Sequence, residues 1–161
     1  MIREELLHPA FVHFPIVIFT LALIFKFIAT CLFQDKSSIK FSFQLMTQIF
    51  IFVGPFTYVL SMYLGDISFD LLRESICNYP AVVNHEEAAQ IPLYFFILAM
   101  LFEVLNTYKS SWSHTRKNIV NFIIIMNLLI GNIYMFKSAS LGGELVYKYG
   151  TGVENHKCQE Q

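Results

Sequence analysis

The chain has 161 residues, of which 55% are hydrophobic and only 14% are charged, and its formal net charge is −1. Soluble domains carry about a quarter charged residues, so this composition predicts a protein embedded in lipid. The sequence has no basic stripe, which argues against nucleic-acid binding. Its three cysteines are scattered, so neither a CxxC motif nor a disulfide scaffold is present.

Four stretches are long and apolar enough to cross a bilayer, because a hydrocarbon core of about 30 Å needs about 20 helical residues. They cover about residues 14–33, 43–64, 85–108 and 119–137. No linker or repeat is evident, so we expect one domain over residues 1–161. Its predicted fold class is all-α, an integral membrane four-helix bundle with a short glycine-rich C-terminal tail.

Four crossings place both termini and the loop between the second and third spans on one side, here called side X. The two short loops on the opposite side, side Y, are net positive, whereas side X is net negative. The two sides carry the same total number of Lys and Arg residues. Cations close to span ends favour the cytoplasm, so we expect both termini to be extracytoplasmic. Cys77 and Cys158 would then meet an oxidising compartment, where they either pair or remain free thiols.

The segment leading into the first span reads His8-Pro9-Ala10-Phe11-Val12-His13-Phe14-Pro15. With His85, at the start of the third span, it would make a three-histidine group near side X. Imidazoles bind metal ions and haem and accept protons, so this group predicts a site of one of those kinds. The alternative is that the rings bond to loop carbonyls and helix ends.

Two ionisable residues lie within the spans, Lys26 in the first and Glu103 in the third. An intramembrane charge costs roughly 2.5–3.5 kcal/mol on insertion scales, so each is expected to face the bundle and find a partner. Their similar depth predicts an intramembrane ion pair. The alternative is that both side chains reach toward the side Y headgroups.

Three spans show small, polar or aromatic residues along one helical face, which favours helix contact in lipid. The third span is expected to begin at a capping box formed by Asn84 and Glu87, with His85 in its first turn. The faces, each at steps of three and four residues, are Gly54, Tyr58, Ser61 and Gly65; His85, Ala89, Pro92, Phe96, Ala99 and Glu103; and Asn127, Gly131, Tyr134 and Ser138.

The segment after the fourth span, residues 142–153, contains four glycines and several apolar residues. Glycine allows tight turns and close backbone approach. The segment is interpreted as a lid over the histidine end, represented by Gly142, Gly143, Tyr147 and Gly150, with an ordinary C-terminal tail as the alternative.

Taken together, the His-Pro-x-x-Val-His-Phe-Pro-Ile motif at residues 8–16, the histidine at position 85 and the Gly-Gly-x-Leu-Val-Tyr-x-x-Gly-x-Gly-Val motif at residues 142–153 resemble a known family. It is the group of bacterial membrane proteins called domain-of-unknown-function family 2231. The resemblance covers nearly the whole chain and implies a four-span fold in the bacterial inner membrane, with the three histidines and the glycine segment at one end. Relatives joined to Rieske-type or cytochrome c modules suggest an electron-transfer setting, although this chain carries neither module's ligand motif.

Three functions are consistent with these residues. The first is a b-type haem near side X, with His13 and His85 as axial ligands and His8 as an alternative ligand or a propionate partner. The second is a copper or zinc site built from the three histidines, with Met62, Met135 or Glu86 as further ligands. The third is a cofactor-free accessory subunit of a membrane complex. No catalytic residue is predicted, so we expect a protein that is not a stand-alone enzyme.

The expected partners follow from the same hypotheses. The lipid bilayer surrounds the spans, and a respiratory, cytochrome c or Rieske-type protein would exchange electrons with a bound haem. The sequence leaves open whether the chain forms a homo-oligomer.

Overall fold

The computed structural model describes residues 3–32, 38–109, 112–153 and 158. Within these residues the chain is helical, with four helical segments long and apolar enough to cross a membrane: Glu4–Leu32, Ser38–Ser75, Tyr79–Tyr108 and His114–Tyr147. This confirms the all-helical fold class. Each segment begins before its predicted apolar core, and the second and fourth also end after theirs. Helices continue into the polar zones beside the hydrocarbon.

The first segment consists of four consecutive pieces: η1 (Glu4–Leu6), α1 (Leu7–Phe11), α2 (His13–Phe27) and η2 (Ile28–Leu32), the last a π-helical turn. The break at Val12, between α1 and α2, has a local cause. Pro15 lacks an N–H group, so the carbonyl of Phe11 loses its usual helical donor, and the proline ring crowds that carbonyl. Apart from the turn at Val12, the His8 to Pro15 segment is helical.

The second segment comprises α3 (Ser38–Leu72) and η3 (Arg73–Ser75), and the third is α4 (Tyr79–Tyr108). Helix α4 begins six residues before His85, with Asn78 as the N-cap: its side chain accepts a hydrogen bond from the backbone N–H of Ala81. The predicted capping box at Asn84 is therefore wrong. Pro80 in the first turn, where no helical donor is needed, favours the earlier start.

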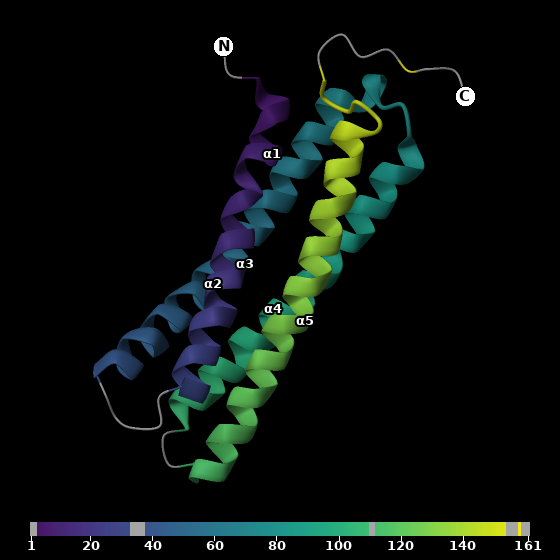
Figure 1. Ribbon diagram of the computed structural model, residues 1–161. Coiled ribbons are helices and arrows are strands. Elements are labelled where there is room, and N and C mark those ends of the chain that lie inside the picture. The colour runs from purple at the N-terminus through teal and green to yellow at the C-terminus, as the bar shows by residue number, and fades with distance from the viewer. Residues whose placement is uncertain (1–2, 33–37, 110–111, 154–157, 159–161) are drawn as a thin grey trace.

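The loop before α4 is tied to the C-terminal tail. Cys77 and Cys158 form a disulfide, which resolves the two alternatives left by the sequence. Arg3 donates a hydrogen bond to the carbonyl of Gly152, 3.4 Å away, so the N-terminal segment lies beside the same tail. Both ends of the described chain are thus at one end of the bundle, the side X end, as Figure 1 shows.

Helix α5 (His114–Tyr147) includes two glycines of the predicted lid. Gly142 and Gly143 lie in its last turns, and Tyr147 is its final residue, 92% exposed. The turn that ends the helix comes later, at Gly150, whose φ of 65° favours glycine. The prediction of a lid starting at Gly142 is therefore wrong, because the helix continues through both glycines.

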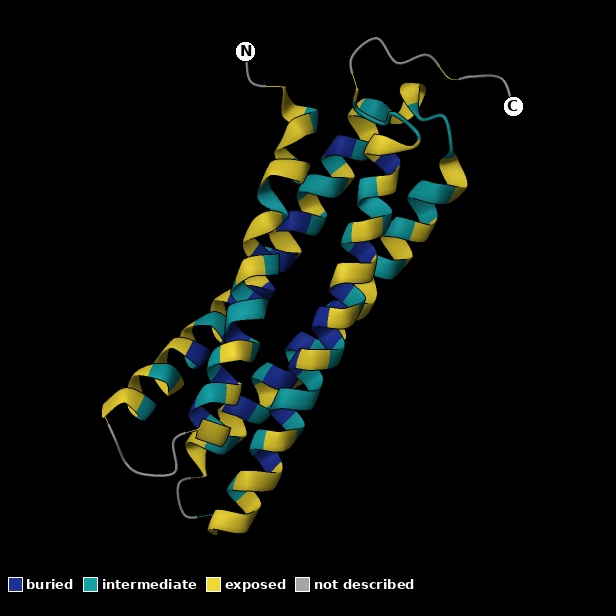
Figure 2. Cartoon of the chain, in the orientation of Figure 1, coloured by how far each residue is buried: buried dark blue, intermediate teal, exposed yellow. Residues whose placement is uncertain are grey.

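The long helices form two closely packed pairs, α2 with α3 and α4 with α5. Helix α2 also contacts α5, and α3 contacts α4, so α2 and α4 face each other across the bundle centre (Figure 1). Large apolar side chains remain exposed on all four, for example Phe27, Phe56, Leu101 and Phe122 (Figure 2). Such a surface is unusual in water and suits contact with lipid tails.

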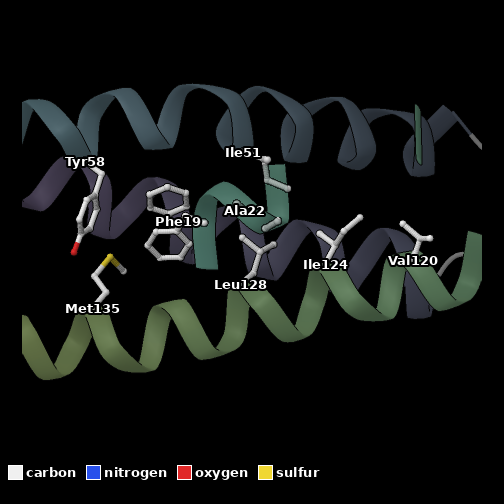
Figure 3. Close-up of a cluster of buried hydrophobic side chains, with 10 residues drawn as sticks. Phe19, Ala22, Ile51, Tyr58, Val120, Ile124, Leu128 and Met135 are labelled. Carbon is white, nitrogen blue, oxygen red and sulfur yellow. The ribbon is translucent and has the colours of Figure 1, made fainter. Parts of the chain in front are cut away.

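The centre of the bundle is built on aromatic rings (Figure 3). Phe19 of α2 and Phe96 of α4 are fully buried and stack with ring centroids 3.5 Å apart and an interplanar angle of 8°. Behind each ring is a glycine of the neighbouring helix, Gly54 behind Phe19 and Gly131 behind Phe96. A side chain at either glycine would occupy the space of the ring. The predicted contact faces of the second and fourth spans therefore pack on the phenylalanines.

Candidate histidine site

His8 in α1 lies against α3 at the side X end. Its Nδ1 is 2.8 Å from the backbone carbonyl oxygen of Ser61. A carbonyl can only accept, so the ring donates from Nδ1. The imidazole also lies against Gly65, where an added Cβ would come within 3.3 Å of the ring atoms. Gly65 therefore lets the ring approach the backbone of α3.

His85 in α4 has the same arrangement against α5. Its Nδ1 donates to the backbone carbonyl oxygen of Ser138, 3.0 Å away. The ring lies against Gly142, where a Cβ would come within 3.0 Å of the imidazole. Gly142, which was predicted to belong to a lid, thus packs against the His85 ring.

The two imidazoles meet across the bundle. The ring centroids of His8 and His85 are 6.3 Å apart, with an interplanar angle of 70°. Both side chains are partly buried. The structure thus brings together one histidine of the first helical segment and one of the third.

His13 lies outside this pair. Its side chain is exposed and has no ring contact with His8 or His85 among the described residues. Five residues along a helix correspond to a rotation of about 140°, so a helix that turns His8 toward α3 turns His13 away. The expectation that His13 and His85 face each other is corrected: the residue opposite His85 is His8.

The hydrogen bonds set what the pair can do chemically. With Nδ1 bearing the hydrogen, a neutral imidazole has its lone pair on Nε2, the atom that binds metal ions. A metal-binding histidine usually donates its other ring N–H to a carbonyl or carboxylate, which fixes the tautomer and the ring orientation. His8 and His85 both have this second interaction, and both donate to main-chain oxygens that cannot move away independently of a helix.

Within the part of the chain that the structure describes, the pair is not extended to a larger ligand set. Among the described residues, no three His, Cys, Asp or Glu side chains are grouped closely enough to hold a metal ion. Of the residues predicted for a copper or zinc site, His13 and Glu86 are exposed and lie outside the His8–His85 pair. His114 lies at the opposite end of the bundle, at the start of α5.

A second polar cluster lies near side Y. Lys26 of α2 and Glu103 of α4 form an ion pair through Nζ and Oε2, and their residues are 4% and 3% exposed. The other carboxylate oxygen of Glu103 accepts a hydrogen bond from Gln48 of α3 at 3.3 Å, and Gln48 also donates to Thr107. Of the two alternatives for these charges, the structure has them facing each other within the bundle.

Sequence reasoning missed a further polar contact between helices. Asn132 of α5 donates to the carbonyl of Phe19 and accepts from the Thr20 hydroxyl at 3.1 Å. Thr20 is a polar residue within an apolar run of the first span, and Asn132 follows Gly131 on a helix rich in apolar residues. Isolated polar residues of this kind often hydrogen-bond across helices in a membrane, and that signal was available.

Comparison with protein families decides the classification. The family model described as a predicted membrane protein, DUF2231, matches residues 5–155. The chain belongs to this family. The match includes His8, His85 and the whole of α5, and it agrees with the four membrane-spanning helices. The family is one of unknown function, so membership fixes the membrane location and not an activity.

No curated protein matches this DUF2231 chain significantly. No solved structure matches it either.

Proposed function

We propose that this DUF2231 protein holds a b-type haem between His8 and His85, near the side X surface, and serves electron transfer there. The observation that carries the proposal is the paired geometry of the two imidazoles, each fixed through Nδ1 by a carbonyl of its neighbouring helix. A six-coordinate low-spin haem iron can take both axial ligands from a protein, and histidine is a common one. Helix bundles build such sites from inward side chains on facing helices.

The separation of the rings supports a single metal centre between them. Metal–imidazole bonds are about 2.0–2.1 Å long, so two imidazoles on opposite sides of one metal have ring centres roughly 6 Å apart. The centroids of His8 and His85 are 6.3 Å apart. The ring planes need not be parallel in such a site, because an imidazole can bind a metal at any angle about the metal–nitrogen bond.

The ligand count favours haem over a bare metal ion. A structural zinc site usually needs four protein ligands, and a blue-copper site takes a cysteine beside its two histidines. Two imidazoles alone meet the requirement of a porphyrin-bound iron, because the porphyrin provides the other four donors. A partner for the haem would be a redox protein that approaches from side X.

The test is haem binding by matched histidine variants. The detergent-purified protein and its His8→Ala, His85→Ala and His13→Ala variants are titrated with haemin, and the Soret and alpha bands are followed. The proposal predicts a six-coordinate low-spin spectrum for the parent and for His13→Ala. Loss of one axial ligand in His8→Ala or His85→Ala should abolish that spectrum or lower haem affinity at least tenfold.

Three results would reject the assignment. Unchanged low-spin haem in both His8→Ala and His85→Ala would place the ligands elsewhere. A parent protein that binds copper or zinc, but no haem, would support the metal-ion alternative. A colourless, metal-free protein that does not respond to haemin would leave the accessory-subunit hypothesis.

We propose that the protein lies in the bacterial inner membrane with side X facing away from the cytoplasm. The Cys77–Cys158 disulfide supports this, because disulfides form and persist in oxidising compartments. Cys31, a free and exposed cysteine near the side Y end of the first segment, provides a matched label. In intact cells, an impermeant maleimide should label reduced Cys77 and Cys158 but not Cys31. The opposite pattern would reverse the orientation.

A further inference from the structure

The two helix pairs repeat each other at a fixed offset. The same residue type recurs 77 positions later at a series of uncharged sites, and both residues are buried in the proline, central phenylalanine, alanine, serine and first glycine pairs. The matching pairs are His8 and His85, Pro15 and Pro92, Phe19 and Phe96, Leu21 and Leu98, Ala22 and Ala99, Phe25 and Phe102, Thr30 and Thr107, Gly54 and Gly131, Ser61 and Ser138, Leu64 and Leu141, and Gly65 and Gly142. No repeat is evident from the motifs of the sequence, because these matches are spread thinly among interchangeable apolar residues.

The contacts repeat with the residues. Each histidine donates from Nδ1 to the carbonyl of a serine 53 positions later in the chain. Each histidine lies on the glycine four residues beyond that serine, and each central phenylalanine lies on a second glycine of the same neighbouring helix. Two independent helix pairs therefore use one packing scheme, from the side X end to the bundle centre.

Equivalent residues also meet each other across the bundle. His8 faces His85, and Phe19 stacks on Phe96 with an interplanar angle of 8°. A residue that contacts its own equivalent lies on the symmetry axis that relates the two halves. Helices α2 and α4 run in the same direction, so this axis runs along the bundle, the arrangement of parallel repeats in membrane transporters.

One on-axis pair breaks the symmetry. The equivalent of Lys26 is Glu103, and these two form the buried ion pair. In a symmetric assembly of identical halves, this position would bring two ammonium groups or two carboxylates together, which is costly in a nonpolar interior. Opposite charges at the two equivalent positions remove that cost. They favour the pairing of the first half with the second over the pairing of two identical halves.

From these observations we propose that the chain is a tandem duplication of a two-helix unit. In this scheme the Lys26–Glu103 pair is the positioning element that holds the two units in register and so aligns His8 with His85. The proposal concerns this chain's own packing and requires no bound haem. Its failure can therefore be distinguished from the failure of the proposed haem site.

The decisive experiment reverses the polarity of the ion pair in the full-length chain. All variants are made in a chain that also carries His8→Cys, His85→Cys and Cys31→Ser. A short bismaleimide crosslinks the cysteines at positions 8 and 85 when these two positions face each other. Lys26→Glu, Glu103→Lys and the combined swap are compared by thermal melting and by the yield of intramolecular crosslink. Glu87→Lys is the matched control, since it reverses an exposed charge on the same helix as Glu103.

Each single reversal places two like charges at the axis, so we expect Tm to fall by about 10 °C or more and the crosslink yield to fall with it. The swap restores an ion pair at equivalent positions, so it should regain most of both quantities, although the Gln48 hydrogen bond to position 103 is lost. Glu87→Lys should change neither. A swap as damaging as the single reversals, or single reversals that leave the crosslink yield unchanged, would overturn the proposal.

Discussion

Gly131→Ala is expected to destabilise the protein by about 1–3 kcal/mol, the usual cost of overpacking a core. A Cβ at this position would lie 2.6 Å from Cε1 of Phe96. The Phe96 ring cannot retreat, because it stacks at 3.5 Å on Phe19, and Phe19 is in turn backed by Gly54. The four residues form one layered stack across the bundle, so an added methyl group has to separate helices. Thermal or denaturant unfolding in detergent measures the loss.

Gly143 offers a control on the same helix. A Cβ there meets nothing within 4 Å, so Gly143→Ala should gain up to about 1 kcal/mol from helix propensity alone. A second variant tests the cause: Gly131→Ala combined with Phe96→Leu provides space and should recover part of the lost stability. Equal stability of Gly131→Ala and Gly143→Ala would contradict the packing described for the bundle centre.

Glu103→Leu is expected to cost about 3–5 kcal/mol, because breaking a buried ion pair leaves one charge without compensation. The Lys26 ammonium would remain in a site where the residue is only 4% exposed. Removing both charges should be far less harmful, so Lys26→Met/Glu103→Leu is expected to be close to the parent in stability. The unfolding free energies of the parent, the two single variants and the double variant complete a double-mutant cycle.

The exposed Arg3–Glu5 pair is the comparison for this cycle. Glu5→Gln should change stability little, since water screens charges at the surface. If Glu103→Leu were as mild as Glu5→Gln, Lys26 would have to reach the headgroups once its partner is gone. That result would contradict an ion pair held inside the bundle.

The number and type of the helices could be predicted from the sequence, because spanning a bilayer demands long apolar runs. The helix ends could not, since hydropathy reports contact with lipid and not where a helix stops. Asn78 caps α4 six residues before the predicted cap at Asn84, and α5 continues through Gly142 and Gly143. Glycine was interpreted as a turn signal, although here it provides room for the His85 ring.

The choice between His8 and His13 was available in the sequence but required the helix to be extended to the N-terminal segment. His85, Pro92, Phe96, Ala99 and Glu103 were placed on one face, and their order of spacing is repeated by His8, Pro15, Phe19, Ala22 and Lys26. Applying the same pattern to the first span selects His8 and leaves His13 off the face. The predicted first span began at residue 14, so the pattern was not extended back to His8.

Contacts between distant segments were the least accessible feature. The carbonyls of Ser61 and Ser138, which hold the two imidazoles, belong to the main chain and have no side-chain signature. The approach of the first and third helical segments depends on how α3 and α5 pack beside them. Such packing is set by close shape matches, for example between Phe19 and Gly54, rather than by composition.

The most direct test of the histidine pair as a haem site is the reduced-minus-oxidised absorption spectrum of the detergent-purified protein after reconstitution with haemin. Paired imidazoles on one iron predict a low-spin spectrum, with a sharp alpha band on reduction and one haem per chain. A protein that gives no alpha band, or only the high-spin spectrum of an iron with a single axial histidine, would show that His8 and His85 do not act together on one metal.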